Sequence, residues 1–490
     1  MKIPPSHTPC QAHVVRVALR CKDELRPQDR SAAPTPTASP LCCDPVAAPA
    51  AIAALKSSAR YLLEGNILPF WLNNMQDHEN GGFYGRIDGH NRLHKDADKG
   101  AILNARILWT FSSAYRVFSH LSPLTPHLSD YLEAARRARD YFLKHFIDRE
   151  YGGVYWSLDC TGKPKDTKKQ FYAIGFAIYG LSEYARATGD REALEQAVSL
   201  YRCIEEHALD HEHNGYIEAK TRDWQPIGDM RLSERDANYP KSQNTHLHII
   251  EPYTNLLRAL RMACPVSCDI IASTEASLRN LITIFTDRIL NPDTHHLDLF
   301  FNMDWSRGSD QEESYGHDIE CSWLMHETAL VLGDPVILKK VEPIVQMVAR
   351  ASEKGLRSLI PCPSPKERGV YSSADTTPTA EATTPLFLGE GLGGEAFGIG
   401  GMDEAVWWVQ AEAVVGFLNI YQHFGDEAAL QKALRCYEYI ENNLVDREHG
   451  EWYWSRRADG TANSDDDKAG FWKCPYHNGR MCLEIIEREI

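Results

Sequence analysis

The sequence has 490 residues, of which 43% are hydrophobic and 10% aromatic, so it can bury a large core in one large domain or in two ordinary ones. A formal net charge of −16, with no block of Lys and Arg, argues against a nucleic-acid partner because phosphate binding needs clustered positive charge. No apolar run approaches the roughly 20 residues that cross a bilayer, which argues against a membrane protein and makes a cytoplasmic location the default expectation.

Two segments have a composition typical of disorder or of loops. Residues 1–50 are rich in Pro, Ala, Ser and Thr, and we expect a disordered extension there. Residues 361–401 combine a Thr/Pro tract with many glycines and predict a surface insertion within a single catalytic domain that spans 51–490. Gly389, Gly391 and Gly394 match G-x-G-x-x-G, but the strand that a nucleotide-binding turn requires does not precede them. We therefore expect no nucleotide cofactor.

The 13 cysteines follow no compact spacing pattern. Cys264 and Cys268 have no second pair at the spacing of a zinc site, and a chain of this length does not need disulfide staples. We expect reduced thiols, no metal, and a monomer as the default oligomeric state.

Apolar residues recur at helical spacing through most of the chain. Ile107, Leu108, Phe111, Ala114 and Phe118 form one stripe of a helix. Similar stripes occur in FAIYGLSEYARAT, HLHIIEPYTNLLRAL, CSWLMHETALVLG and AEAVVGFLNIYQHF, whereas long strand-like alternation is missing. The pattern predicts an all-α protein.

A short signature returns between these helices. It reads DHENGGFYGRID from Asp77, DREYGGVYWSLD from Asp148, DHEHNGYIEAKT from Asp210 and DREHGEWYWSRRADG from Asp446, with weaker echoes that begin at Pro292 and Lys366. Such self-similarity marks a repeated supersecondary unit, and the spacing gives about six units of roughly 60 to 85 residues. We predict six helical hairpins that close into an (α/α)6 barrel, with short β-hairpins or loops at one rim. An open superhelix has the same period and remains the alternative.

Three residues share one face of the segment NTHLHIIEPY. Asn244, His248 and Glu251 fall at i, i+4 and i+7, whereas His246 points elsewhere. A metal site on His246 and His248 is disfavoured, because side chains two residues apart diverge on a helix.

The segment SYGHDIECSWL places His317 and Glu320 at i and i+3, so the carboxylate can hold one tautomer of the imidazole, and Trp323 lies near the same face. The alternative is a core histidine bonded to a backbone carbonyl.

In WWVQAEAVVGF, Trp408 and Glu412 are four residues apart on an apolar helix. A buried glutamate must be paired or functional, and pairing with an arginine is the alternative to a site role.

KAGFWKCPYHNGR, near the C-terminus, is predicted to be an aromatic loop that carries Trp472, His477 and Arg480. Loops at a barrel rim commonly form sites, although a packed terminal lid gives the same pattern. Arg106 is adjacent to the apolar stripe that begins at Ile107, so its side chain can extend either into solvent or into an internal cavity. Tyr172 and its neighbour at i+4 are spaced like an ordinary core pair.

The combination is more informative than any of its members. Ionisable residues recur on inward-capable faces of different repeats, together with tryptophans that can stack on sugar rings, and carbohydrate sites are built in this way. Because histidine titrates near neutral pH, two histidines on opposite sides of a carbon can remove and return a proton. The residues therefore supply candidates that are compatible with an enzyme that moves a proton on a sugar.

The stretches that carry these residues resemble the N-acylglucosamine 2-epimerase superfamily, and most closely its cellobiose 2-epimerase branch. The match runs from about residue 60 to the C-terminus, and its stretches are FWLNNMQDHENGGFYGRIDG, DKGAILNARILWTFSSAYR, NYPKSQNTHLHIIEPYTNLLR, SYGHDIECSWL, WWVQAEAVVGF and GFWKCPYHNGRMCLE. The resemblance implies an (α/α)6 barrel. It also implies epimerisation at C2 of the reducing-end glucose of β-1,4-linked disaccharides, such as cellobiose and lactose, without a metal or nucleotide.

The resemblance also implies roles for single residues. His317 and His477 match the two acid/base histidines, and His248 matches the histidine associated with ring opening and closing. Arg106 and Asn244 would hold the oxygens of the opened aldehyde and of a cis-enediolate. The remaining matches either support the histidines or line the sugar, and they are Glu320, Glu412, Tyr172, Trp323, Trp408 and Trp472.

Three other functions remain open from the sequence. An aldose–ketose isomerase of the same superfamily shares the enediolate and returns the proton elsewhere. A glycoside hydrolase needs two carboxylates across a glycosidic bond, for which Glu320 and Glu412 are the candidates. A sugar-binding protein explains the tryptophans but not the three histidines.

Overall fold

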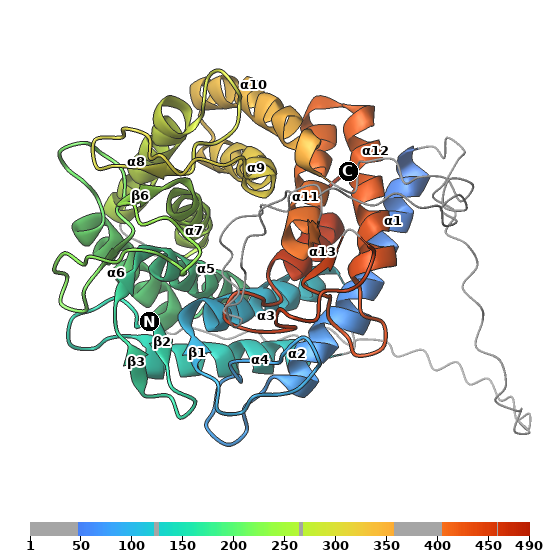
Figure 1. Ribbon diagram of the computed structural model, residues 1–490, viewed down its shortest axis with the longest axis horizontal. Helices are drawn as coiled ribbons and strands as arrows, with labels where there is room; N and C mark the ends of the chain where they lie inside the picture. The colour runs from blue at the N-terminus through green and yellow to red at the C-terminus, as the bar shows by residue number, and fades with distance from the viewer. Residues whose placement is uncertain (1–47, 122–126, 264–267, 357–403, 458) are drawn as a thin grey trace, which may run out of the picture. The chain divides into compact units, whose positions relative to one another are not determined.

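A computed structural model describes residues 48–121, 127–263, 268–356, 404–457 and 459–490. Its helices form two concentric rings (Figure 1). Each inner helix contacts the next one along the chain, and the last contacts the first, so the inner ring is closed. The inner helices are α3 (Ala101–Leu121), α5 (Phe171–Thr188), α7 (Gln243–Met262), α9 (Tyr315–Leu332), α11 (Trp407–Phe424) and α13 (His477–Glu487).

One outer helix covers each inner helix. Five outer helices follow their partners in the chain, whereas α1 precedes the whole barrel and packs on α13, which joins the two ends of the described chain. The outer helices are α1 (Ala48–Leu62), α4 (Leu128–Tyr141), α6 (Arg191–His207), α8 (Cys268–Ile284), α10 (Pro335–Ser352) and α12 (Glu427–Tyr439), and a short α2 (Leu68–Asn74) follows α1. Among the described residues, four π-helical turns (Leu63–Ile67, Phe142–Phe146, Phe285–Ile289, Ile440–Leu444) and one 3₁₀ turn (Glu353–Gly355) extend outer helices. The predicted all-α (α/α)6 barrel is confirmed, and the ring is closed.

The two rings differ in how they are buried. In α6 the buried residues recur at helical spacing from Ala193 to Ile204, which leaves one polar face for solvent. In α3 every residue from Ala101 to Ala114 is buried, including Arg106. The single apolar stripe expected for α3 therefore underestimates its burial. The inner helix on each side covers part of its surface, an outer helix covers its outer face, and its inner face lies in the barrel interior.

A Gly-Asp pair forms the turn between three inner helices and their outer partners. In the first of these turns Gly189 has a φ of 75°, which favours glycine, and the Asp190 carboxylate accepts a hydrogen bond from the backbone N–H of Ala193 at 2.9 Å. The glycine ends one helix and the aspartate caps the next. The same arrangement recurs at Gly333–Asp334 and Gly425–Asp426.

Short antiparallel strands join neighbouring repeats at one rim. Each sheet pairs a strand that leads into an inner helix with a strand of the next repeat, as in Lys99 opposite Leu158. A single bridge between Ile87 and Ala469 joins the first repeat to the last. The sheets are β1 (Lys99–Gly100) with β2 (Ser157–Leu158) and β3 (Pro164–Asp166), β4 (Lys169–Gln170) with β5 (Ala219–Lys220), β6 (Lys241–Ser242) with β7 (Phe300–Phe301), and β8 (Glu404–Val406) with β9 (Ser455–Arg457).

The repeated signature has a structural role at this rim. The first aspartate of a signature folds its own turn, as Asp148 does by accepting the backbone N–H of Glu150 at 3.0 Å, and it also pairs with a buried lysine just before the next inner helix. Such pairs bind the rim loop to the start of that helix. They are Asp77–Lys99 at 2.7 Å, Asp148–Lys169 at 2.9 Å, Asp210–Lys241 at 2.7 Å, and Asp446–Lys468. The repeat that echoes from Pro292 uses His296 and Asp318 instead, 2.6 Å apart.

Two segments predicted from the sequence lie mainly outside the residues that the structure describes. The insertion at 361–401, with its G-x-G-x-x-G match, lies outside the described residues, and so do residues 1–47 of the expected extension. Residues 48–50, which the prediction assigned to that extension, instead form the first turn of α1. Among the described helices, none combines the length and the apolar character needed to span a bilayer.

Candidate active site

The predicted site residues converge at one end of the barrel. They lie in the first three turns of the inner helices, and these helices all begin at the rim that carries the short strands. The placement is Arg106 on α3; Tyr172 on α5; Asn244 and His248 on α7; His317, Glu320 and Trp323 on α9; Trp408 and Glu412 on α11; and His477 on α13, with Trp472 just before it. The inward-facing residues of all six repeats thus share one interior.

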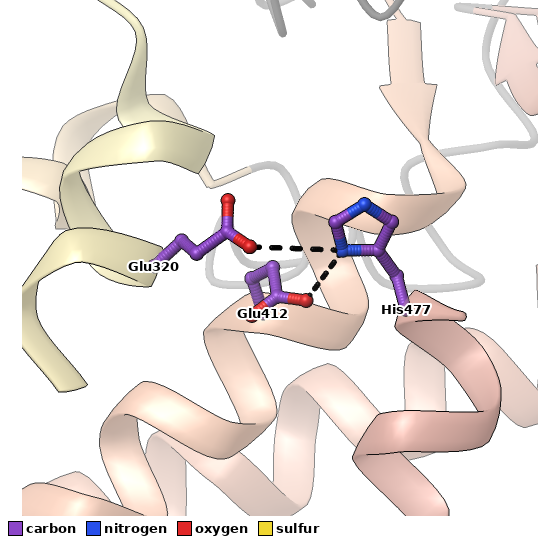
Figure 2. A group of neighbouring side chains, drawn as sticks. All are labelled: Glu320, Glu412 and His477. Carbon is purple, nitrogen blue, oxygen red and sulfur yellow. Dashed lines mark hydrogen bonds and ion pairs between the residues drawn. The ribbon is translucent and has the colours of Figure 1, made fainter. Parts of the chain in front are cut away.

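His477 is held by a carboxylate from a neighbouring helix. Its Nδ1 lies 2.6 Å from Glu412 Oε1 and 3.9 Å from Glu320 Oε1. Dashed lines mark both contacts in Figure 2. The imidazole is 2% exposed, and its ring packs against Trp408 with centroids 5.5 Å apart. One expectation needs correction: His477 is the first residue of α13 rather than part of a loop, because the helix begins two residues after Pro475, which is excluded from a helix interior.

Arg480, one turn further along α13, connects the carboxylates of three helices. Its Nη2 donates to Glu320 Oε1 and to Glu412 Oε1, each at 2.6 Å. Its Nη1 donates to Glu251 and to the Tyr476 hydroxyl. Arg480 was not among the predicted site residues, although its i+3 spacing from His477 was a usable signal. Glu412 shows both of the roles considered for it, since it pairs with an arginine and also holds a catalytic candidate.

The buried carboxylates differ in their ionisation. Burial opposes ionisation of Glu412, but Arg480 and His477 hold the pKa of that carboxyl below its usual range. Burial likewise opposes ionisation of Glu251, yet Arg480 and His248 lower its pKa to about 2. For Glu320, burial and the neighbouring charge of Glu412 raise the pKa. The cluster therefore combines two anionic carboxylates with one that holds a proton more readily.

His317 has a different Nδ1 partner from the one expected. The Ser314 hydroxyl lies 2.7 Å from His317 Nδ1, whereas Glu320 Oε1 accepts from Arg480 and does not hold this imidazole. Glu320 instead pairs with Arg480, because a guanidinium is a strong, charged hydrogen-bond donor for a buried carboxylate. The His317 ring packs against Trp408, with centroids 4.9 Å apart, so one tryptophan contacts both proposed acid/base histidines.

His248 lies at a kink in α7. Its φ of −91° and ψ of 19° are non-helical, because Pro252, four residues later, has no N–H to donate to the His248 carbonyl. The freed carbonyl approaches α5, where a Cβ added at Gly175 would lie 2.2 Å from it, so only glycine fits there. His248 Nδ1 lies 3.1 Å from Glu251 Oε2, which confirms that the two share a helix face.

Arg106 turns into the barrel. It is fully buried, and its Nη2 donates to the Tyr172 hydroxyl at 3.0 Å. Its guanidinium lies 4.0 Å from the centre of the Phe176 ring, and the rings of Phe176 and Tyr172 each lie 4.9 Å from that of His248. The supposed core pair at i and i+4 therefore lines the site and links Arg106 to His248.

Other histidine and tryptophan predictions are resolved by geometry. His246 is structural, since its Nε2 accepts from the backbone N–H of Tyr216 at 2.9 Å and burial lowers its pKa to about 4. Trp323 donates its Nε1 proton to Glu412 Oε2 at 3.0 Å and thereby orients the carboxylate. Asn244 is half-buried and lines a small cavity together with His317.

A cleft of about 600 Å³ opens at the rim next to these residues. Trp472 lies on its wall, together with Trp156 and Trp454, and charged side chains such as Lys168 and Arg231 complete it. Aromatic faces among polar groups suit a carbohydrate.

Glu320, Glu412 and His477 have the spacing of a metal site, since their ligating atoms lie within 4.8 Å of one another. Both carboxylates, however, already receive hydrogen bonds from Arg480 Nη2. The guanidinium thus supplies the positive charge that a metal ion would otherwise bring to this pair.

Comparison with known proteins gives consistent matches over most of the chain. A family model described as N-acylglucosamine 2-epimerase matches residues 82–360 and 391–479. The cellobiose 2-epimerase of Bacteroides fragilis is 51% identical over 433 residues, which are 88% of this chain and 98% of the relative. The cellobiose 2-epimerase structure from Bacillus thermoamylovorans superposes with a TM-score of 0.73 at 36% identity and covers 89% of this chain and 100% of that one. A D-mannose isomerase superposes with a TM-score of 0.68 at 19% identity over 89% of this chain and 98% of that one, which shows the shared fold.

Proposed function

Because this chain belongs to the N-acylglucosamine 2-epimerase family, we propose that it inverts C2 of the reducing-end glucose of β-1,4-linked disaccharides. Cellobiose would give the glucosyl-mannose epimer, and lactose would give epilactose. The extent and identity of the match to relatives named cellobiose 2-epimerase support this activity.

The observation that carries the proposal is the position of two histidines around one tryptophan. His317 and His477 come from α9 and α13, and their rings lie 4.9 Å and 5.5 Å from the Trp408 ring. Inversion at a carbon needs a base on one face and an acid on the other, so two histidines that flank a shared space suit it. Trp408 would then define where the sugar lies between them.

Ring opening must precede proton removal, because only an aldehyde at C1 acidifies the C2 proton. We assign ring opening and closing to His248, which Glu251 orients at 3.1 Å. Arg106 and Asn244 would donate hydrogen bonds to O1 and O2 of the cis-enediolate, the species that most needs stabilisation. Arg106 is suited to this role because burial strengthens its interaction with a developing negative charge.

Proton transfer requires one neutral histidine and one protonated histidine at the same time. His477 has an anionic neighbour in Glu412 at 2.6 Å, which stabilises an imidazolium, whereas the Ser314 hydroxyl beside His317 is neutral. An imidazolium is therefore favoured at His477. Tyr172, Trp323, Trp408 and Trp472 would line or stack the sugar, and Glu320 would support the histidine on α13 through Arg480.

The geometry disfavours the hydrolase alternative. A glycosidase needs one carboxylate on each side of the scissile bond, with the carboxyl groups roughly 5 to 10 Å apart. Glu320 and Glu412 instead accept hydrogen bonds from the same nitrogen of Arg480, and neither is exposed. An aldose–ketose isomerase uses the same enediolate, and a D-mannose isomerase shares the fold, but the relatives named cellobiose 2-epimerase do not favour this alternative.

Incubation with cellobiose in D2O, followed by NMR of the reducing end, tests the proposal. Deuterium at C2 together with a mannose epimer supports epimerisation. A ketose product supports the isomerase, free glucose supports a hydrolase, and an unchanged spectrum contradicts any catalytic function on this sugar.

We also propose that the protein acts as a monomer in the cytoplasm on a small-molecule sugar. Similarity to sugar epimerases supports the class of substrate. Size-exclusion chromatography with light scattering at several protein concentrations tests the monomer, and fractionation of the source cells tests the location.

A further inference from the structure

We propose that Arg480 is a positioning residue that links the histidine assigned to ring opening, His248, to the histidine assigned to proton transfer, His477. The roles given to the two histidines rest on the proposed function, but the link between them is a property of the free protein. Each histidine is reached through one glutamate.

The guanidinium has one nitrogen for each branch. Nη1 donates to Glu251 Oε1, and the other oxygen of that carboxylate lies 3.1 Å from His248 Nδ1. Nη2 donates at 2.6 Å to Glu412 Oε1, and that same oxygen lies 2.6 Å from His477 Nδ1. A continuous chain of contacts therefore runs from α7 through α13 to α11 and returns to α13.

Burial makes the link strong. Arg480 is fully buried, as are Glu320 and Glu412, and Glu251 is 2% exposed. Water does not screen charges in such a place, so a change at one carboxylate alters how firmly the guanidinium binds the other. An arginine remains charged throughout the accessible pH range, so the positive charge of Arg480 stays constant while the neighbouring groups titrate.

The charged and titratable groups around Arg480 come from every inner helix that meets it. Besides the two glutamates, α9 contributes Glu320, and the turn before α13 contributes the Tyr476 hydroxyl. The guanidinium groups of Arg480 and Arg106 both lie over the Tyr476 ring, 4.3 Å and 4.7 Å from its centre, and this ring also packs against Tyr179. A single cation thus faces three carboxyl groups, and replacing any one of them redistributes its interactions.

This arrangement predicts an effect between residues that do not share a contact. Replacing Glu412 with Gln removes one carboxylate partner of Arg480, so Arg480 pairs more firmly with Glu251, and Glu251 then stabilises a protonated His248 less. The titration midpoint of His248 should move to lower pH by about half a unit or more. By the same argument Glu251→Gln should lower the midpoint of His477.

The experiment is a histidine titration by NMR on the full chain labelled at imidazole carbon, with resonances assigned from His248→Asn and His477→Asn. A double-mutant cycle separates the link from direct electrostatics. In an Arg480→Met background, the effect of Glu412→Gln on His248 should fall to less than half of its original size. A cross-effect of undiminished size in that background, or no cross-effect in the wild type, would overturn the proposal.

Two further variants keep the test decisive if Arg480→Met folds poorly. Arg480→Lys retains the charge but not the forked donors, so it should weaken the cross-effect in folded protein. Arg116→Lys is the matched control, since Arg116 is a largely buried arginine that pairs with Glu183 at the opposite end of the barrel. It should lower thermal stability and leave both midpoints unchanged, and a shift of either midpoint in this control would contradict a link specific to Arg480. The titration needs no substrate, so failure of the proposed function would not be mistaken for failure of the link.

Discussion

The Nδ1 atom of His477 and the Oε1 atom of Glu412 lie 2.6 Å apart, although 65 residues separate the two in the chain. They meet because α11 and α13 are neighbours in the inner ring and each residue lies near the start of its helix. Within the same ring, His317 on α9 also contacts Trp408, with ring centroids 4.9 Å apart. The closed barrel therefore brings the two proposed acid/base histidines together from distant repeats.

Replacing either His317 or His477 with Asn should lower C2 exchange at least about 100-fold, because each histidine would remove or return a proton that asparagine cannot transfer. The measurement is deuterium incorporation at C2 of cellobiose in D2O, followed by NMR. Circular dichroism and a thermal unfolding curve would establish that each variant is folded.

A buried histidine elsewhere on α9 provides the control. His326 is 1% exposed and packs with Asn419 towards the far end of the helix. Its replacement with Asn should reduce stability but leave C2 exchange within a fewfold of the wild type. If the His317 variant retained exchange at the level of this control, the two-histidine mechanism would be wrong.

We expect the hydrogen bond from Ser314 to His317 to increase the rate of the step that His317 carries out. It occupies the N-cap position of α9, but its hydroxyl is directed to His317 Nδ1 at 2.7 Å instead of to the helix backbone. Ser314→Ala should lower kcat about tenfold with a smaller effect on KM, since loss of a buried hydrogen bond costs about 1 to 3 kcal/mol. Ser314→Thr, which keeps the hydroxyl, should recover most of the activity. Equal losses in both variants would indicate a packing effect instead.

Local patterns were sufficient to predict the helices and the number of repeats. Apolar spacing identified the helices, and the recurring Asp-and-glycine signature gave the number of units because each Asp–Lys pair repeats the same rim contact. Closure could not be derived from the period alone, since it depends on contacts between α3 and α13 at opposite ends of the described chain. The resemblance to a known superfamily supplied the closed form.

The site was predictable as a set of residues but not as a set of partners. Helical spacing placed His248 and Glu251 on one face, and the structure confirms their contact. Spacing also suggested that Glu320 holds His317, which is wrong because Arg480, 160 residues away, attracts the carboxylate. Pairings within one helix follow from sequence, whereas pairings across the barrel depend on tertiary geometry and on which buried charge is strongest.

Trp472 should contribute to disaccharide binding. It lies 6% exposed on the wall of the rim cleft, and its ring centroid lies 6.2 Å from that of Tyr172. Trp472→Ala should raise the KM for cellobiose roughly five- to tenfold, with a smaller effect on kcat, if the indole stacks on a sugar ring. Initial rates over a range of cellobiose concentrations give both constants. A fall in kcat at unchanged KM would place this residue nearer to the proton-transfer step than to binding.

Glu183 lies at the end of the barrel opposite the site, and it should make the stability of the protein depend on pH in the acid range. Its carboxylate receives hydrogen bonds from Arg116 at 2.6 Å and Arg186 at 2.7 Å. Burial opposes its ionisation, but the two arginines lower its pKa from 4.5 to about 2. A carboxyl whose pKa is lower in the folded state stabilises the fold fully above its unfolded value of 4.5, and this stabilisation is lost as pH falls towards 2.

Glu183→Gln should therefore reduce the free energy of unfolding by about 3 kcal/mol near neutral pH, because it leaves buried arginines without a carboxylate. The difference from the wild type should shrink between pH 4.5 and pH 2, where the wild-type carboxyl also becomes neutral. Urea unfolding at several pH values measures it. Glu133→Gln is the control, since the Glu133–Arg136 pair is exposed and contributes little. A constant difference down to pH 2 would show that Glu183 stabilises the barrel through its shape and hydrogen bonds rather than through its charge.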